Sequence, residues 1–67
     1  MTQSTNLSPS ISSWLQYVGQ YLVLRTRLNQ FGELVCIQSI TMDGLLWYTN
    51  GGGELGRVRL NDILSLR

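Results

Sequence analysis

The feature that most constrains this chain is a series of short β-type runs separated by turn residues. The run Tyr21–Leu28 alternates polar and apolar residues in its second half, and Leu45–Thr49 is apolar and aromatic. Turn-forming residues separate the runs: the Asp-Gly pair at Asp43, a hairpin signal, follows Glu33–Thr41, and the loop Asn50–Gly53 follows Leu45–Thr49. Short strands at roughly ten-residue spacing, joined by turns, are typical of small barrels. We expect strands at Tyr21–Leu28, Glu33–Thr41, Leu45–Thr49, Glu54–Leu60 and Leu64–Arg67.

A short helix is expected before the first strand. Ser8 and Pro9 suit the cap and the first position of a helix, with Ser10 as a rival cap. Apolar residues then recur at helical spacing, and Gly19 is a natural stop. The sequence therefore predicts a helix over residues 9–18 that closes one end of a strongly bent antiparallel barrel. A partner-binding helix is the alternative, whereas the absence of Lys and Arg from its polar face argues against a membrane surface.

The composition suggests that the chain associates with itself. A domain of 67 residues buries only about 60% of the surface of its unfolded chain. Yet 43% of the residues are apolar and only 13% are charged, where about 25% charged residues are usual. We expect other copies of the chain to cover part of this apolar surface, so that the protein is a homo-oligomer. Residues 1–7 are polar and predicted to be a disordered tail, and residues 8–67 are predicted to be a single domain.

Two Arg-x-Arg pairs contain four of the five basic residues, and the sequence has no lysine. The pairs are Arg25 with Arg27 and Arg57 with Arg59. Alternation along a strand places both arginines of a pair on one face, roughly 7 Å apart, with the intervening residue facing the core. Arginine suits phosphate and carboxylate groups and stacks on bases. The alternative is a solvated strand face, with the arginines paired to acidic side chains. In the first run the inward side chains would be Leu22, Leu24, Thr26 and Leu28, and the candidate acidic partners are Glu33, Glu54 and Asp62.

The sequence lacks the groups that most enzymes use. There is no histidine, the four acidic residues are scattered, and we interpret the one cysteine, Cys36, as a small buried hydrophobe. We therefore predict no enzyme activity, no catalytic residue, no metal site and no cofactor. No signal peptide or membrane-length apolar run is recognisable, so a cytoplasmic protein without a membrane partner is expected. The net charge of +1 predicts no strong non-specific binding of nucleic acid by a single subunit.

The order of one helix and five strands resembles the small SH3-like barrels, and among them the Sm-like family that includes bacterial Hfq. That family has a valine near the end of the fourth strand, an isoleucine five residues later and an apolar residue three beyond. Val58, Ile63 and Leu66 match this spacing. The layout match extends from Ser8 to Arg67.

Other positions depart from the Sm-like pattern. The first motif of the family ends in Asp followed by Met-Asn, whereas Asp43 is followed by Gly44 and Leu45. The second motif has Arg before Gly, whereas this chain has Gly56 before Arg57. The Lys-His pair of Hfq falls at Leu60-Asn61. The RNA-contacting residues of the family therefore do not transfer one by one.

The resemblance implies a ring of six or seven subunits, in which the fourth strand of one subunit pairs with the fifth strand of the next. This pairing would bring the two Arg-x-Arg pairs of neighbouring subunits about 10 Å apart. The predicted function is a ring that binds single-stranded RNA. The predicted site comprises Arg25, Arg27, Arg57 and Arg59, with Phe31, Tyr48 or Trp47 as stacking groups.

Three alternatives stay open at this point. The chain is also compatible with an SH3-like protein-interaction or structural subunit that has no nucleic-acid role. Trp14 and Trp47 are alternatively core anchors of a small barrel. The plasmid-encoded dihydrofolate reductases are SH3-like tetramers that catalyse from a shared central pore. No motif of this chain matches them, but the sequence of one subunit does not exclude an assembly with such a pore.

Overall fold

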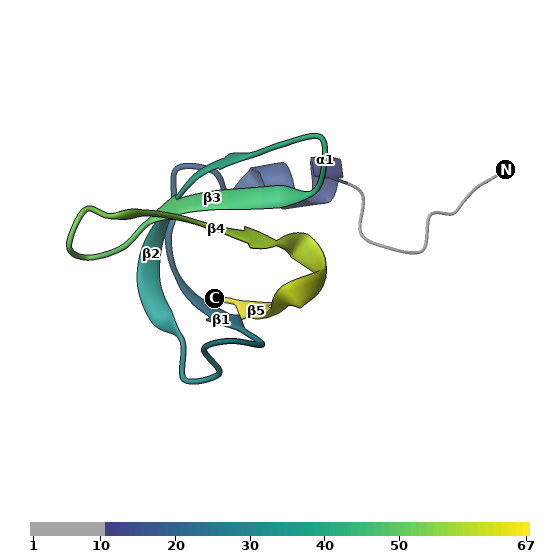
Figure 1. Ribbon diagram of the computed structural model, residues 1–67. Coiled ribbons are helices and arrows are strands. Elements are labelled where there is room, and N and C mark those ends of the chain that lie inside the picture. The colour runs from purple at the N-terminus through teal and green to yellow at the C-terminus, as the bar shows by residue number, and fades with distance from the viewer. Residues whose placement is uncertain (1–10) are drawn as a thin grey trace, which may run out of the picture.

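The computed structural model describes residues 11–67, so the predicted tail and the helix start at Ser8–Ser10 lie outside the described residues. The described chain begins with a short helix and continues as five strands (Figure 1). The helical part is α1 (Ile11–Trp14) followed by the 3-10 turn η1 (Leu15–Tyr17). The strands are β1 (Tyr21–Thr26), β2 (Glu33–Ile40), β3 (Leu45–Thr49), β4 (Leu55–Arg59) and β5 (Ile63–Leu66), with a second 3-10 turn, η2 (Leu60–Asp62), between the last two.

The five strands form one antiparallel sheet with the order β4-β3-β2-β1-β5. The mainly β fold with a short N-terminal helix, which the sequence predicts, is confirmed. The sheet curls strongly, as Figure 1 shows, but it does not close, because β4 and β5 lie at its two ends and do not pair with each other. The architecture is therefore barrel-like with two open edges.

The core lies on the inner face of the curled sheet. Its buried apolar side chains are Leu24, Val35, Ile37 and Leu46, each at most 2% exposed. They come from β1, β2 and β3 at alternate positions, which is the expected pattern for strands with one buried face. Cys36 lies between two of them and is half-buried with a free thiol. The prediction of a buried Cys36 is therefore only partly right, because alternation turns it away from the core.

The first strand ends two residues earlier than predicted. The backbone N–H of Thr26 donates to the carbonyl of Asn29 at 3.1 Å, and the N–H of Asn29 donates back at 3.2 Å. This reciprocal pair closes a tight turn directly after Thr26, so Leu28 leaves the strand and is 98% exposed. The predicted inward position of Leu28 is wrong for this reason.

The β3–β4 hairpin requires a close approach between a glycine and an aromatic ring. Gly56 lies opposite Tyr48 in the register of the two strands. A Cβ on Gly56 would lie 2.6 to 2.8 Å from three atoms of the Tyr48 phenol. Tyr48 packs against the core cluster, so it has little room to retreat. Glycine is therefore needed at this position for packing.

We predict that Gly56→Ala lowers the free energy of unfolding by about 1–3 kcal/mol, because the added methyl group overpacks the hairpin. Gly51→Ala is the matched control, since a Cβ there meets no atom within 4 Å, and it should change stability by less than about 0.5 kcal/mol. Urea unfolding of both variants measures the difference. Equal stability of the two variants would refute the close packing of Gly56.

Candidate functional site

The arginines of both pairs point away from the core. Thr26, between Arg25 and Arg27, is 8% exposed, and Val58, between Arg57 and Arg59, packs against the core cluster. The predicted alternation is confirmed for Arg57 and Arg59, which both lie on β4. Arg25 lies on β1, but Arg27 follows the end of this strand and belongs to the turn. In the sheet order, however, β2 and β3 separate the strands that carry them. A single subunit therefore does not bring the two pairs together on neighbouring strands.

Arg57 stacks on Trp47 across the β3–β4 ladder. The two residues are register partners, and the guanidinium carbon of Arg57 lies 5.5 Å from the centroid of the indole ring. A cation–π contact of this kind at an exposed site contributes about 0.5–1 kcal/mol. Trp14 packs against the core as one alternative predicted, but Trp47 is not part of the core contacts. Because Leu46 is fully buried, alternation turns Trp47 to the outer face.

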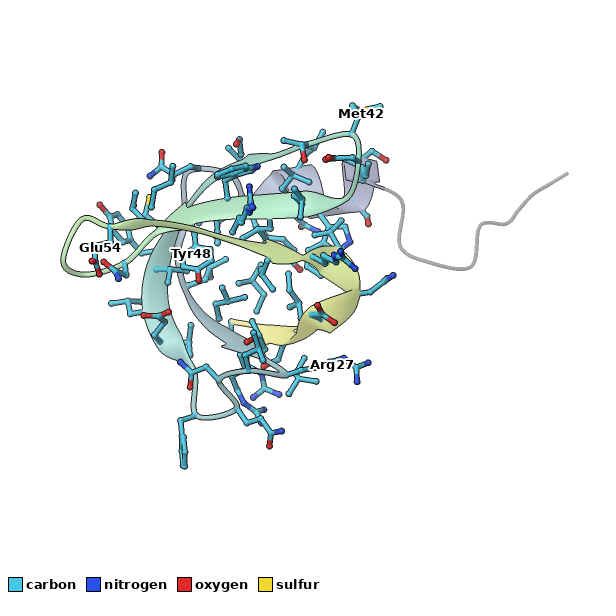
Figure 2. The ribbon with its side chains drawn as sticks, in the orientation of Figure 1. Arg27, Met42, Tyr48 and Glu54 are labelled. Carbon is cyan, nitrogen blue, oxygen red and sulfur yellow. The ribbon has the colours of Figure 1, made fainter. Side chains whose placement is uncertain are left out.

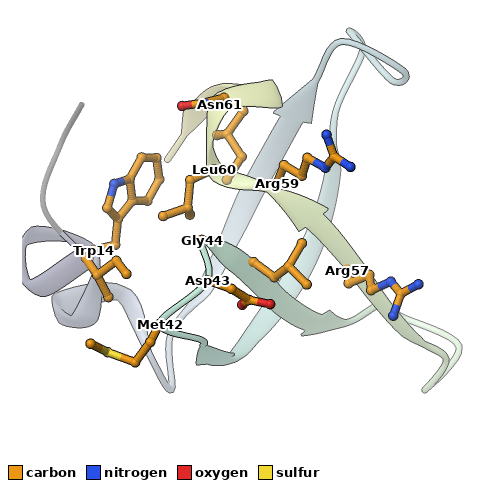
Figure 3. A pocket seen from close by; sticks show the side chains of 11 residues that line it. Trp14, Met42, Asp43, Gly44, Arg57, Arg59, Leu60 and Asn61 are labelled. Atoms are coloured by element: carbon orange, nitrogen blue, oxygen red, sulfur yellow. The ribbon is translucent and has the colours of Figure 1, made fainter. Parts of the chain in front are cut away.

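A groove of about 960 Å³ lies where α1, the β2–β3 turn, the end of β4 and η2 meet (Figure 3). Arg57 and Arg59 extend from the same side of β4 at the rim of this groove, and their guanidinium groups point away from Trp14 and Met42. Asp43 is the one acidic side chain in its lining. The groove therefore combines apolar walls with an excess of positive charge. Its lining residues are Ile11, Trp14, Met42, Asp43, Gly44, Leu45, Arg57, Arg59, Leu60, Asn61 and Ile63.

Hydrogen bonds hold the walls of the groove together. The backbone N–H of Leu60 donates to the carbonyl of Gly44 at 2.9 Å, which ties η2 to the β2–β3 turn. The Thr41 hydroxyl donates to the Asp43 carboxylate and so orients this side chain. These hydrogen bonds fix the shape of the groove, and Arg59 and Asn61 lie on its exposed rim.

The first arginine pair has different surroundings. The Nε of Arg25 donates to the Gln30 carbonyl at 2.7 Å. The Nε of Arg27 lies 3.4 Å from the Asp62 carboxylate, and the side chains of this ion pair are 67% and 45% exposed. An exposed pair contributes little, about 0–1 kcal/mol, so Arg27 can exchange Asp62 for an anionic ligand at small cost. From the sequence, ion pairing with an acidic side chain is the alternative to phosphate binding. Asp62 forms such a pair with Arg27, whereas within residues 11–67 neither Glu33 nor Glu54 pairs with an arginine.

The predicted stacking residues lie in contrasting environments. Phe31 is 98% exposed on the β1–β2 turn, as its position beside a glycine suggests. Tyr48 packs against the core, and burial raises the pKa of its phenol, with the negative charge of Glu33 as a further cause. Tyr48 is half-buried, so its ring is less accessible to a base than the ring of Phe31. Of the three aromatic residues proposed for stacking, Phe31 is thus fully accessible and Trp47 is already covered by Arg57.

Sequence reasoning missed most of the groove. Trp14, Met42 and Asn61 come from three segments far apart in the chain, and no local motif connects them. The Asp43-Gly44 pair indicates a hairpin turn, but its position near Arg59 follows only from the pairing of Leu45 with Arg59 across β3 and β4. The structure brings Arg57 and Arg59 together in the groove and leaves Arg25, Arg27 and Phe31 around a separate turn.

Comparison with known proteins adds no assignment. No family model matches this chain, and no curated protein or solved structure matches it significantly. Among residues 11–67, no helix has the length and apolar character to cross a membrane. The same residues contain no group of three or more His, Cys, Asp or Glu side chains that could hold a metal ion. The Sm-like resemblance therefore stays a prediction from sequence.

We predict that Tyr48→Phe reduces the loss of stability at alkaline pH. The pKa of Tyr48 in the folded protein lies above the ordinary value of 10.0. The contribution of this shift to the free energy of unfolding is therefore complete below about pH 10 and is lost as the pH rises through the folded pKa. Urea unfolding of both proteins from about pH 9 to about pH 11 measures this loss. An equal decline in the two proteins would show that Tyr48 does not cause it.

Proposed function

We propose that the protein is a homo-oligomer, assembled through its open sheet edges, that binds single-stranded RNA through arginine side chains. The observation that supports this proposal is the location of β4 and β5 at the two edges of the sheet. β4 carries Arg57 and Arg59, and β5 lies beside β1, where Arg25 pairs with Ser65. Pairing of β4 with β5 of another copy would set the two arginine pairs about 10 Å apart.

The backbone of β4 is arranged for such pairing. The register of β3 and β4 pairs Leu46 with Val58 and Thr49 with Leu55. Leu60 donates to Gly44 at one end of this ladder, and Asn50 donates to the Glu54 carbonyl at the other. Because hydrogen-bonded pairs alternate along an antiparallel ladder, every second residue of β4 bonds to β3, and the residues between them direct their backbone groups away from β3. The set whose backbone groups face the open edge is Leu55, Arg57 and Arg59.

The charge of the proposed surface suits a polyanion. Arg57 and Arg59 line the groove with Asp43 as their one acidic neighbour, and Arg57 is oriented by a neutral indole ring. Guanidinium groups present a fork of donors that matches phosphate oxygens. The net charge of one chain is only +1, so binding depends on repeating this local excess around an oligomer.

We predict that Leu55→Pro converts the oligomer to a monomer. Proline removes an N–H that faces the open edge of β4, so a neighbouring strand loses a hydrogen bond while the β3–β4 ladder is kept. Leu55→Ala is the control, because it removes the apolar side chain and keeps the N–H. Sedimentation velocity at micromolar concentration measures the mass. A wild-type mass of 7.6 kDa, or identical masses for the two variants, would contradict assembly through β4.

We also predict that Arg57→Gln combined with Arg59→Gln weakens binding of an oligo-U probe by about tenfold or more. The slope of log binding constant against log salt concentration should fall by the amount expected for about two phosphate contacts. Arg67→Gln is the single-charge control at the exposed C-terminal residue. Fluorescence anisotropy at several salt concentrations measures both quantities. Absence of binding by a confirmed wild-type oligomer at low salt would rule out the RNA function.

A second candidate is a protein-interaction subunit without an RNA role. The observation that favours it is an apolar outer face, on which Tyr21 is 73%, Leu34 is 59% and Leu55 is 62% exposed. The register places Tyr21 and Leu55 at the ends of one row across β1, β2, β3 and β4. Exposed apolar surface of this kind is common at sites of protein association. This candidate takes precedence if the oligomer does not bind RNA.

A further inference from the structure

The β1–β2 turn displays an aromatic ring on a fixed backbone. Phe31 is 98% exposed, yet the turn around it is held by several hydrogen bonds. Besides the reciprocal Thr26–Asn29 pair, the Asn29 side chain accepts from the backbone N–H of Gly32 at 3.3 Å. The ring is therefore presented to solvent by an ordered turn, so a ligand would not have to order the backbone that carries it.

Arg25 is held against the backbone of the residues on both sides of Phe31. Its Nε donates to the carbonyl of Gln30 at 2.7 Å, and its Cγ lies 2.8 Å from the place that a Cβ on Gly32 would occupy. Gln30 and Gly32 are the two chain neighbours of Phe31, so the Arg25 side chain extends along the backbone that carries the ring. Only Nε is used in this contact, so the two terminal nitrogens of the guanidinium keep their donors for a ligand. Gly32, with φ of +87°, leaves the space that this arrangement needs.

We propose that Phe31 and Arg25 form a nucleotide-binding site separate from the groove, in which an unpaired base stacks on the phenyl ring and its phosphate binds Arg25. The inference rests on the proposed RNA function and deepens it by assigning a stacking group. Arg27, which follows β1 directly and forms an exposed ion pair with the Asp62 carboxylate, supplies a second cation for an adjacent phosphate. A base needs only a flat ring and a nearby cation, and this turn provides both.

Leu28 allows this site to be distinguished from an apolar docking surface. It lies on the same turn and is also 98% exposed, but its side chain has no π face. A protein groove or a lipid surface would use Leu28 and Phe31 alike, because both gain from burial of apolar area. A stacked base would use Phe31 alone. The two side chains are thus a matched pair for a test of stacking.

The experiment measures binding of an oligo-U strand that contains one 2-aminopurine, whose fluorescence falls when it stacks on an aromatic ring. We expect Phe31→Leu to weaken binding by roughly tenfold and to abolish the quenching, because it keeps an apolar side chain and removes the π system. Phe31→Trp should retain both signals, and Leu28→Ala should bind as the wild type does. Arg25→Gln should reduce the salt dependence by about one phosphate contact. Thermal unfolding confirms that each variant is folded, as expected for exposed positions.

The outcomes separate this inference from the proposed function. Wild-type binding with unchanged affinity and quenching in Phe31→Leu would overturn the stacking site and leave the RNA function intact. Weakened binding in Leu28→Ala would also overturn it, in favour of apolar docking, because a stacked base does not use Leu28. Failure of the wild-type oligomer to bind at low salt would overturn both proposals together. Selective loss in Phe31→Leu, with retention in Phe31→Trp, would establish the site.

Discussion

Burial of four aliphatic side chains inside the curl of the sheet is the interaction on which the other features depend. Leu24, Val35, Ile37 and Leu46 bring β1, β2 and β3 into contact on one face. Each fully buried side chain of this type contributes about 1.5–3 kcal/mol, so a core of this size has little stability to spare. It therefore relies on close packing at its margin, such as the contact between Tyr48 and Gly56 (Figure 2 labels Tyr48 beneath β4).

The small core also explains why the sheet edges matter. A sheet that curls without closing leaves backbone donors and acceptors along β4 and β5. Unpaired edges are a hazard for aggregation, which proteins limit by short strands, charged side chains or pairing with a partner. Here β5 has only four residues and β4 carries Arg57 and Arg59. The same two arginines that discourage uncontrolled edge pairing are the ones that a regular assembly would present to a polyanion.

The sequence predicts the strands well because alternation is a local property. The arginines of each pair are predicted to face outward because the residue between them, Thr26 or Val58, suits the inner face of the sheet. Other features depend on contacts that no local pattern reveals. The exposed position of Leu28 follows from the reciprocal bonds between Thr26 and Asn29, and the groove exists only because the β2–β3 turn meets η2. The contact of Arg25 with the backbone around Phe31 likewise requires a side-chain conformation that the alternation does not determine.

The partners of the arginines reconcile a nearly neutral chain with a site for anions. Arg25 is held by a carbonyl oxygen and Arg57 by an indole ring, and both partners orient the guanidinium without cancelling its charge. Arg27 is paired to the Asp62 carboxylate, but the two side chains are 67% and 45% exposed, so solvent screens their attraction. A net charge of +1 therefore understates the local potential, because the acidic residues do not neutralise the arginines that are oriented for binding.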